Sequence, residues 1–161
     1  MKLLVVGGGG REHAIIRSLK KNPEVTEIFA CPGNGGIAKD ATCVNIGAKD
    51  IDAMFLKKAD ILNDRVVVLD GEGWHHGVIG IVCSKVVERT GKPCVLISSD
   101  GEAARGSARS VEGFSMIDAV SYAAEHLTRY GGHPFAAGMS LDSSKIDDFR
   151  KAVNEFAAKL D

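Results

Sequence analysis

The stretch RVVVLD, residues 65–70, is the segment on which the fold of this chain depends. Three consecutive valines followed by a leucine are typical of a buried β-strand. An apolar helix is expected at 78–90, where Gly91 ends it, and another strand is expected from Pro93 to Ser98. Strands that alternate with helices indicate an α/β fold, with residues 65–70 as a central strand.

The residues before this stretch show the same alternation of strand and helix. Residues 2–6 form a short apolar run followed by four glycines, which favours a buried strand and a turn into a helix. Asn22-Pro23 is a typical stop for that helix. The elements expected in this part of the chain are strands at 2–6 and 27–31, a short strand at 43–46, and helices at 11–21 and 50–58.

The residues after it predict a hairpin and two more helices. The sequence SDGEA at 99–103 is typical of a turn, so we expect residues 104–110 to pair beside the preceding strand. The remaining expected elements are a helix at 115–129 with Ser115 as N-cap, a strand at 136–141, and a last helix that starts after 142–144 and runs to about 160. Together these elements predict a layered α/β/α architecture around a central mixed, largely parallel sheet.

The composition is that of an ordinary globular protein, with 45% apolar and 25% charged residues and a net charge of −1. Such a charge gives no overall field that would recruit nucleic acid or an anionic membrane, so polyanion binding would need a local patch. The start MKLLVVGGGG has too short an apolar run for a signal peptide, and no run is long enough to span a membrane. The four cysteines form no CxxC pair or zinc-ligand spacing, which favours buried thiols in a reducing cytoplasm and no metal or cofactor.

The glycines at 7–10 lie between an expected strand and an expected helix, where backbone N–H groups can hold an anion. The dinucleotide-binding pattern fails, because Glu12 or His13 occupies its third glycine position. No acidic residue ends the strand at 27–31 to bind a ribose hydroxyl. A tight turn that needs glycine only for packing is therefore the alternative to an anion site.

The segments MKLLVVGGGGREHAI, IFACPGNGGIA and CVNI resemble the start of the glycinamide ribonucleotide synthetase family, which joins glycine to phosphoribosylamine with ATP. The resemblance covers residues 1–58 and implies a Rossmann-like opening that precedes an ATP-grasp fold. It also implies that this region helps to form the phosphoribosyl pocket. The candidate anion-binding residues that it carries over are Gly8, Gly9, Gly10, Arg11 and Asn34. We find no ATP-grasp segment in the sequence and therefore expect no ligation.

A second glycine-rich constellation lies in the last third of the chain. On a strand, Ser107 and Arg109 point to the same side, and arginine presents a planar fork that suits phosphate oxygens. The glycines before His133 let a backbone come close to a ligand. The candidate phosphate-binding or nucleic-acid-binding set is Ser107, Arg109, Ser110, Gly131, Gly132 and His133. A solvated arginine and a turn, with His133 capping a helix, is the alternative.

Three segments, LDGEGWHHGVIGIVCSKVVERTGKPCVLIS, ARGSARSVEGF and RYGGHPFAAGMSL, are similar to the DHH-associated domain of the RecJ family of single-strand-specific 5′-to-3′ DNA exonucleases. The resemblance spans residues 62–160. It implies that the Gly-Gly-His loop and the Ser/Arg segment face the active cleft and hold the DNA backbone. It also implies that manganese is bound mainly by a separate Asp-His-His domain, which we do not find here.

The only His-His pair is His75-His76, and Trp74 precedes it in place of aspartate. A metal set of Asp70 with these two histidines has no second carboxylate cluster to support it, and a strand-end loop with a structural tryptophan is the alternative. Hydrolysis in this family needs metal-activated water. We therefore expect no catalytic residue and no bound metal, and we read His133 as a phosphate holder without metal partners.

The two resemblances meet in FLKKADILND, residues 55–64. Both parent folds place a strand, a glycine loop and a helix at this point, so the strand at 65–70 can serve both. This predicts one composite domain over 1–161, with a synthetase-like segment at 1–58 and a DHH-associated segment at 59–161. A designed chimera is our interpretation, with a gene-fusion accident or a mis-assembled reading frame as the alternative.

We expect this chimera to be an engineered or recombined α/β protein without catalytic turnover, and we expect any retained function to be weak binding of phosphate or single-stranded nucleic acid. The alternative is a nucleic-acid-binding fragment of a RecJ-like exonuclease. Neither a cofactor, a membrane nor a protein partner is expected.

Overall fold

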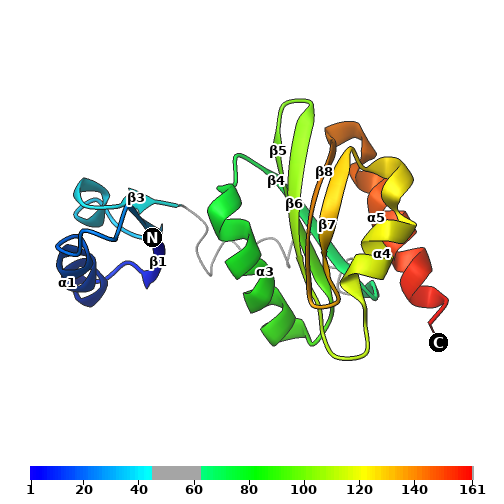
Figure 1. Ribbon diagram of the computed structural model, residues 1–161, viewed down its shortest axis with the longest axis horizontal. Coiled ribbons are helices and arrows are strands. Elements are labelled where there is room, and N and C mark those ends of the chain that lie inside the picture. The colour runs from blue at the N-terminus through cyan, green and yellow to red at the C-terminus, as the bar shows by residue number, and fades with distance from the viewer. Residues whose placement is uncertain (45–62, 161) are drawn as a thin grey trace. The chain divides into compact units, whose positions relative to one another are not determined.

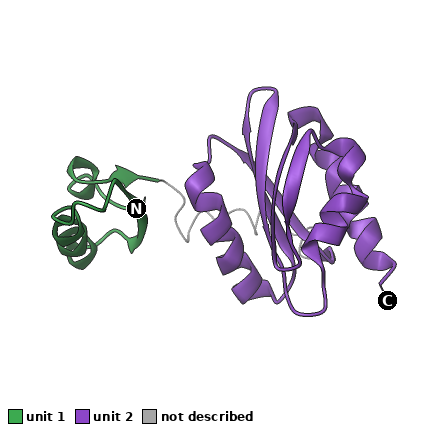
Figure 2. Ribbon diagram, viewed as in Figure 1, with its two compact units in different colours: residues 1–53 green, residues 54–161 purple. Residues whose placement is uncertain are grey.

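The computed structural model describes residues 1–44 and 63–160. The chain divides into two compact units, residues 1–53 and 54–161 (Figure 2). The helix predicted at 50–58 and the second half of the strand predicted at 43–46 lie outside the described residues. Each unit is described by itself below.

In its described residues, unit 1 contains a parallel sheet and the helix that the sequence predicts at 11–21. Its strands pair in the order β1-β2-β3. Its small core contains the buried residues Ile16, Ile28, Ala30 and Ile37. The elements are β1 (Lys2–Gly7), α1 (Gly10–Leu19), β2 (Glu27–Pro32), the 3-10 turn η1 (Ile37–Lys39) and β3 (Thr42–Cys43).

Asp40 ties α1 to the segment that follows η1. Its carboxylate accepts a hydrogen bond from His13 Nε2 at 2.8 Å and forms an ion pair with Lys20 Nζ at 2.9 Å. Arg17 Nε lies 3.5 Å from the same carboxylate. The hydrogen bond from His13, followed by that from Lys20, lowers the pKa of Asp40 to about 2. Unit 1 is therefore held together in part by a charge that acid removes.

We expect unit 1 to lose stability between about pH 4 and pH 2 through Asp40. A carboxyl group whose pKa is lowered on folding stabilises the fold at pH values above its unfolded pKa, and this contribution disappears as the pH falls through its folded pKa. Asp40→Asn should lower the unfolding temperature at pH 6 and flatten the pH dependence in that window. NMR signals of the α1 amides during heating at pH 6, 4 and 2 would measure this. Glu24→Gln is the control, and equal acid sensitivity of D40N and wild type would contradict the assignment.

Unit 2 contains a five-stranded mixed sheet in the order β4-β5-β6-β8-β7. β4 and β5 are parallel, and the other neighbouring strands are antiparallel, so this sheet is mixed as predicted but not largely parallel, because the segments after β5 return as hairpins. The predicted hairpin after the SDGEA turn is confirmed. The elements are β4 (Val67–Glu72), α3 (His76–Thr90), β5 (Cys94–Asp100), β6 (Ala103–Arg109), α4 (Met116–Tyr122), η3 (Ala124–His126), β7 (Arg129–His133), β8 (Ala136–Asp142), η4 (Ser143–Lys145) and α5 (Ile146–Ala158).

The helices of unit 2 lie on opposite faces of this sheet, which confirms the layered α/β/α class (Figure 1). On one face, α3 packs over β5 and β6. On the other face, buried residues of β6 and β8 join α4 and α5 in one core, centred on Phe149 and Val153. Ala104, Ala108 and Met139 belong to that core, so alternate residues of the same strands must face the α3 side.

The helix predicted at 115–129 is shorter than expected. α4 ends at Tyr122 instead of residue 129, and residues 129–133, which begin at the expected helix end and continue through the expected loop, form β7. Thr128 N–H donates to Ser140 O at 2.8 Å, and the next five residues pair with β8. Pairing with β8 satisfies the backbone groups of this glycine-containing segment, and a tertiary partner of this kind outweighs the helical spacing of the sequence.

The strand predicted at 65–70 belongs to the sheet of unit 2 alone, and the described strands form two separate sheets instead of the merged one that we predicted. The outer edge of β4 is covered by α5. Asn154 accepts from Val66 N–H at 2.9 Å and donates to Val66 O at 3.1 Å, and Arg150 Nε donates to Val68 O at 3.3 Å. The backbone groups of Val66 and Val68 point toward this outer edge. The N–H group of Val67, between them, points the other way and donates a hydrogen bond on the β5 side. One composite domain over 1–161 stays a prediction.

Candidate anion-binding face

Three polar rows cross the strands of unit 2 on the side that faces away from the α4–α5 core. Registry between β6, β8 and β7 aligns them residue by residue. We call this surface the open face, because no described helix packs on β8 and β7 there. Its rows are Arg109–Ala136–His133, Ser107–Gly138–Gly131 and Arg105–Ser140–Arg129.

Ser107 and Arg109 point to the same side of β6, as the sequence predicts. Arg109 Nη1 donates to Ser107 Oγ at 3.2 Å and to Ala108 O at 2.8 Å, which fixes the direction of the guanidinium. The guanidinium lies against Gly80 of α3, where an added Cβ would be 2.8 Å from Nη2 and 3.0 Å from Ser107 Oγ. Gly80 therefore provides the space in which this arginine and serine lie under the helix.

Ser110 does not join this pair. Its hydroxyl donates to Phe114 O at 2.7 Å, and its backbone N–H donates to Phe135 O at 3.0 Å. Both bonds fix the loop after β6. A binding role for Ser110 stays a prediction, and the contacts described here are those of a loop anchor.

The two glycines of β7 have different surroundings. A Cβ on Gly131 would meet nothing within 4 Å, so this position leaves bare backbone on the open face. A Cβ on Gly132, which has a φ of +153°, would lie 2.3 Å from Ala136 O and 2.6 Å from Ala137 Cα. His133 is exposed at the end of β7, in the Arg109 row, and caps no helix. Gly132 is thus required by the hairpin, whereas Gly131 is available to a ligand.

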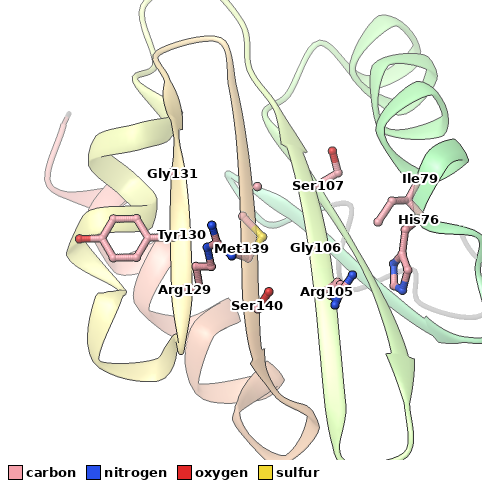
Figure 3. A pocket seen from close by; sticks show the side chains of 11 residues that line it. His76, Ile79, Arg105, Gly106, Ser107, Arg129, Tyr130, Gly131, Met139 and Ser140 are labelled. Atoms are coloured by element: carbon pink, nitrogen blue, oxygen red, sulfur yellow. The ribbon is translucent and has the colours of Figure 1, made fainter. Parts of the chain in front are cut away.

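A hollow of about 540 Å³ lies on the open face and is lined partly by residues that the sequence did not single out. Arg105 and Arg129 flank Ser140, and His76 at the start of α3 lies beyond Arg105 (Figure 3). No acidic residue is among those that line it. Arg105 could have been found from its spacing of two residues from Ser107. Arg129 could not, because its segment was predicted to be helical.

The described residues do not fit a metal ion. Asp70 forms an ion pair with Arg150 Nη2 at 2.6 Å, and His75 Nδ1 accepts from Gly77 N–H at 3.1 Å as the N-cap of α3. Within residues 1–44 and 63–160 there is no group of three histidine, cysteine or acidic side chains that could hold one. We therefore derive no metal-dependent step for this chain.

In unit 1, the predicted anion-binding residues are largely engaged with one another. Asn34 Nδ2 donates to Gly8 O at 2.6 Å, while Asn34 Oδ1 accepts from the N–H groups of Gly36 and Ile37. Glu12 accepts from Gly9 N–H at 2.6 Å, so a carboxylate of the chain itself lies at the start of α1. Arg11 is exposed, and Gly10 has open space around its Cα. Anion binding at this loop stays a prediction, and an anion there would have to displace Glu12.

The cysteines are free thiols, and Cys31, Cys83 and Cys94 are buried, as expected. A hydrogen bond with Cys83, together with burial, raises the pKa of Cys94 well above its usual value. A protonated, buried thiol is a poor nucleophile, so Cys94 has a packing role. In the described part of the chain, no helix has the length and apolar character needed to cross a membrane.

The geometry defines unit 2 as an α/β/α domain with a cationic open sheet face. Residues 63–159 match the family model described as DHHA1 domain, and residues 1–93 match the one described as phosphoribosylglycinamide synthetase, N domain. The chain therefore belongs to both families through these segments and has a two-part chimeric architecture. This confirms both resemblances, and the two matches overlap across β4 and α3, the strand and helix common to both parents.

The individual relatives follow the same division. The chain is 41% identical over 98 residues to the single-stranded-DNA-specific exonuclease RecJ of Bacillus subtilis, covering 60% of this chain and 12% of that protein. It is 52% identical over 54 residues to the phosphoribosylamine–glycine ligase of Caldanaerobacter subterraneus, covering 34% of this chain and 13% of that protein. The crystal structure of RecJ in complex with Mg²⁺ from Thermus thermophilus aligns with a TM-score of 0.56 and 30% identity, over 70% of this chain and 18% of that one. The chain thus spans less than a fifth of these relatives.

Proposed function

We propose that unit 2 binds single-stranded nucleic acid through its phosphate backbone on the open face, and that the chain has no catalytic turnover of its own. The observation that carries this proposal is the presence of Arg105, Arg109 and Arg129 on the same side of the sheet, where Arg105 and Arg129 are exposed and Arg109 lies against Gly80 of α3. None of the three forms an ion pair with a carboxylate in the described residues, whereas Arg150 pairs with Asp70 and Asp147. The relatives named for single-stranded-DNA-specific exonucleases support the same ligand.

Contacts to phosphate groups would make this binding independent of the base sequence. Arginine and serine donors hold phosphodiester oxygens without reading sequence, and backbone N–H groups do the same where glycine leaves them accessible. The absence of turnover rests on the donor set: neither the open face nor the Asp70–His75 region, as described, presents a set of groups that can activate water. We further infer that the chain arose by recombination, by design or by gene fusion, because its two family matches meet between residues 63 and 93.

Gly80→Ala should weaken nucleic-acid binding without weakening the fold. The new methyl group would displace Arg109 Nη2 and Ser107 Oγ, which are flexible side-chain ends, while alanine favours the α3 helix over glycine. We expect the affinity for a labelled oligothymidylate at low salt to fall about tenfold, with an unfolding temperature equal to or above that of wild type. Fluorescence anisotropy and a thermal melt would measure the two quantities.

Arg109→Ala should give a similar loss of affinity. Lys151→Ala is the matched control, because it removes one positive charge from an exposed position of α5, on the opposite side of the sheet. Binding of wild type should also weaken steeply with salt. If wild type bound no oligothymidylate at low salt, or if R109A and G80A both bound as wild type does, the proposed site would be wrong. Sustained release of mononucleotides would contradict the absence of turnover.

A further inference from the structure

The row Arg105–Ser140–Arg129 is the most cationic feature of the open face, and the function proposed above does not say how its two arginines share the ligand with Arg109. Its residues come from β6, β8 and β7, which the registry places side by side. Adjacent strands are separated by about 4.8 Å, so the two arginines start about 10 Å apart with the Ser140 hydroxyl between them. Side chains of this length can converge on one anion above Ser140.

Neither arginine is neutralised by the protein. In the described parts of the chain, Arg105 and Arg129 form no ion pair, although Arg17 and Arg150 on other surfaces do. Two guanidinium groups that flank one position without a carboxylate repel each other and create a positive potential in a confined space. His76 adds a further donor at the start of α3, the positive end of that helix dipole.

The structure has a hollow above the row Arg105–Ser140–Arg129 in which a ligand can bind. The hollow of about 540 Å³ is lined by Arg105, Arg129, Ser140 and His76 (Figure 3). Gly131 and Gly138, in the neighbouring row, add no side chains, so the floor there is bare backbone. A sugar-phosphate chain can therefore approach the sheet between the two rows.

We propose that Arg105, Ser140 and Arg129 form a second phosphate position, so that the open face holds at least two phosphates of a single strand. This inference rests on the proposed function. Residues 105 and 109 of β6 are four positions apart, which corresponds to about 13 Å along the strand. One phosphate cannot contact both ends of that span, but a short oligonucleotide that runs along β6 and β8 can. The preferred ligand is therefore an oligonucleotide and not a mononucleotide.

The test compares ligands of different length on the full chain. Wild type, R105A/R129A, R109A and the control K151A are titrated with inorganic phosphate, thymidine 5′-monophosphate, and oligothymidylates of two, four and eight nucleotides. We expect R105A/R129A to weaken binding of the eight-nucleotide ligand about tenfold and leave the monophosphate unchanged. Its salt dependence should become shallower by about 1.4 in the slope of log K against log salt, from two lost contacts at about 0.7 each.

The outcomes separate this inference from the proposed function. R109A should weaken the monophosphate and the long ligand alike. If R109A weakens oligonucleotide binding while R105A/R129A does not, the second position is wrong and the proposed function survives. If R105A/R129A weakens the monophosphate as strongly as the eight-nucleotide ligand, the row is part of the first position and the inference also fails. If wild type binds no oligonucleotide, both fail. Both arginines are exposed, so the unfolding temperature of R105A/R129A should match that of wild type.

Discussion

Gly132→Ala is expected to destabilise unit 2 by about 3 kcal/mol, and Gly131→Ala is expected to leave its stability almost unchanged. A Cβ at position 132 would lie 2.3 Å from Ala136 O and 2.9 Å from Ala137 Cβ. Both are parts of the adjacent strand and cannot move without opening the β7–β8 pairing. The φ of +153° adds strain for any residue other than glycine. At position 131, a Cβ would meet nothing within 4 Å.

Urea unfolding followed by the fluorescence of Trp74, the single tryptophan, would measure both variants. The two substitutions are chemically identical and adjacent, so any general effect of adding a methyl group to β7 is shared. Because the methyl group of G131A lies on the open face, that variant should also bind oligothymidylate more weakly than wild type at equal stability. Equal stability of G132A and G131A would contradict the close approach between β7 and β8.

Much of unit 2 could be predicted from local patterns. The valine run of β4, the turn at SDGEA and the apolar face of α5 each indicate an element within a few residues of its observed bounds. Ser107 and Arg109 were placed on one side of a strand by simple alternation, and their hydrogen bond agrees with that placement. These signals depend on near neighbours in the chain, which the sequence displays directly.

The features that were missed depend on distant neighbours. The sequence predicts Arg129 as the end of a helix and the following Gly-Gly-His residues as a loop, because nothing in residues 129–133 reveals that β8 will pair with them. Without β7, Arg129 could not be aligned with Arg105 through Ser140, so the row of these three residues could not be predicted. The engagement of Asn34 and of Glu12 with other parts of unit 1 also depends on loop geometry that the glycine pattern alone does not give.

The expected merged sheet depended on β4 having a free edge. Sequence similarity to both parents made residues 65–70 a plausible strand for either sheet, and both family matches do include β4. What decides its pairing is α5, about 80 residues further along the chain, whose side chains occupy the edge. A helix that covers a sheet edge also protects it from pairing with other chains.

Asn154→Ala is therefore expected to destabilise unit 2 by about 3 kcal/mol, the second large effect that we predict. The side chain of Asn154 satisfies both backbone groups of Val66, a residue with 0% exposure, and donates to Arg150 O at 3.1 Å. Its truncation leaves a buried N–H and a buried C=O without their partner. Urea unfolding followed by Trp74 fluorescence would measure the loss, with Glu155→Ala, at the next and exposed position of α5, as control.

Asn154→Asp separates hydrogen bonding from packing, because aspartate has nearly the same shape as asparagine. It keeps an acceptor for Val66 N–H but replaces the amide donor by an oxygen that faces Val66 O and Arg150 O. At pH 7 we expect this variant to lose most of the stability that N154A loses. If N154D were as stable as wild type at that pH, the edge would be covered by packing alone. Hydrogen exchange should show the same order, with the β4 amides least protected in N154A.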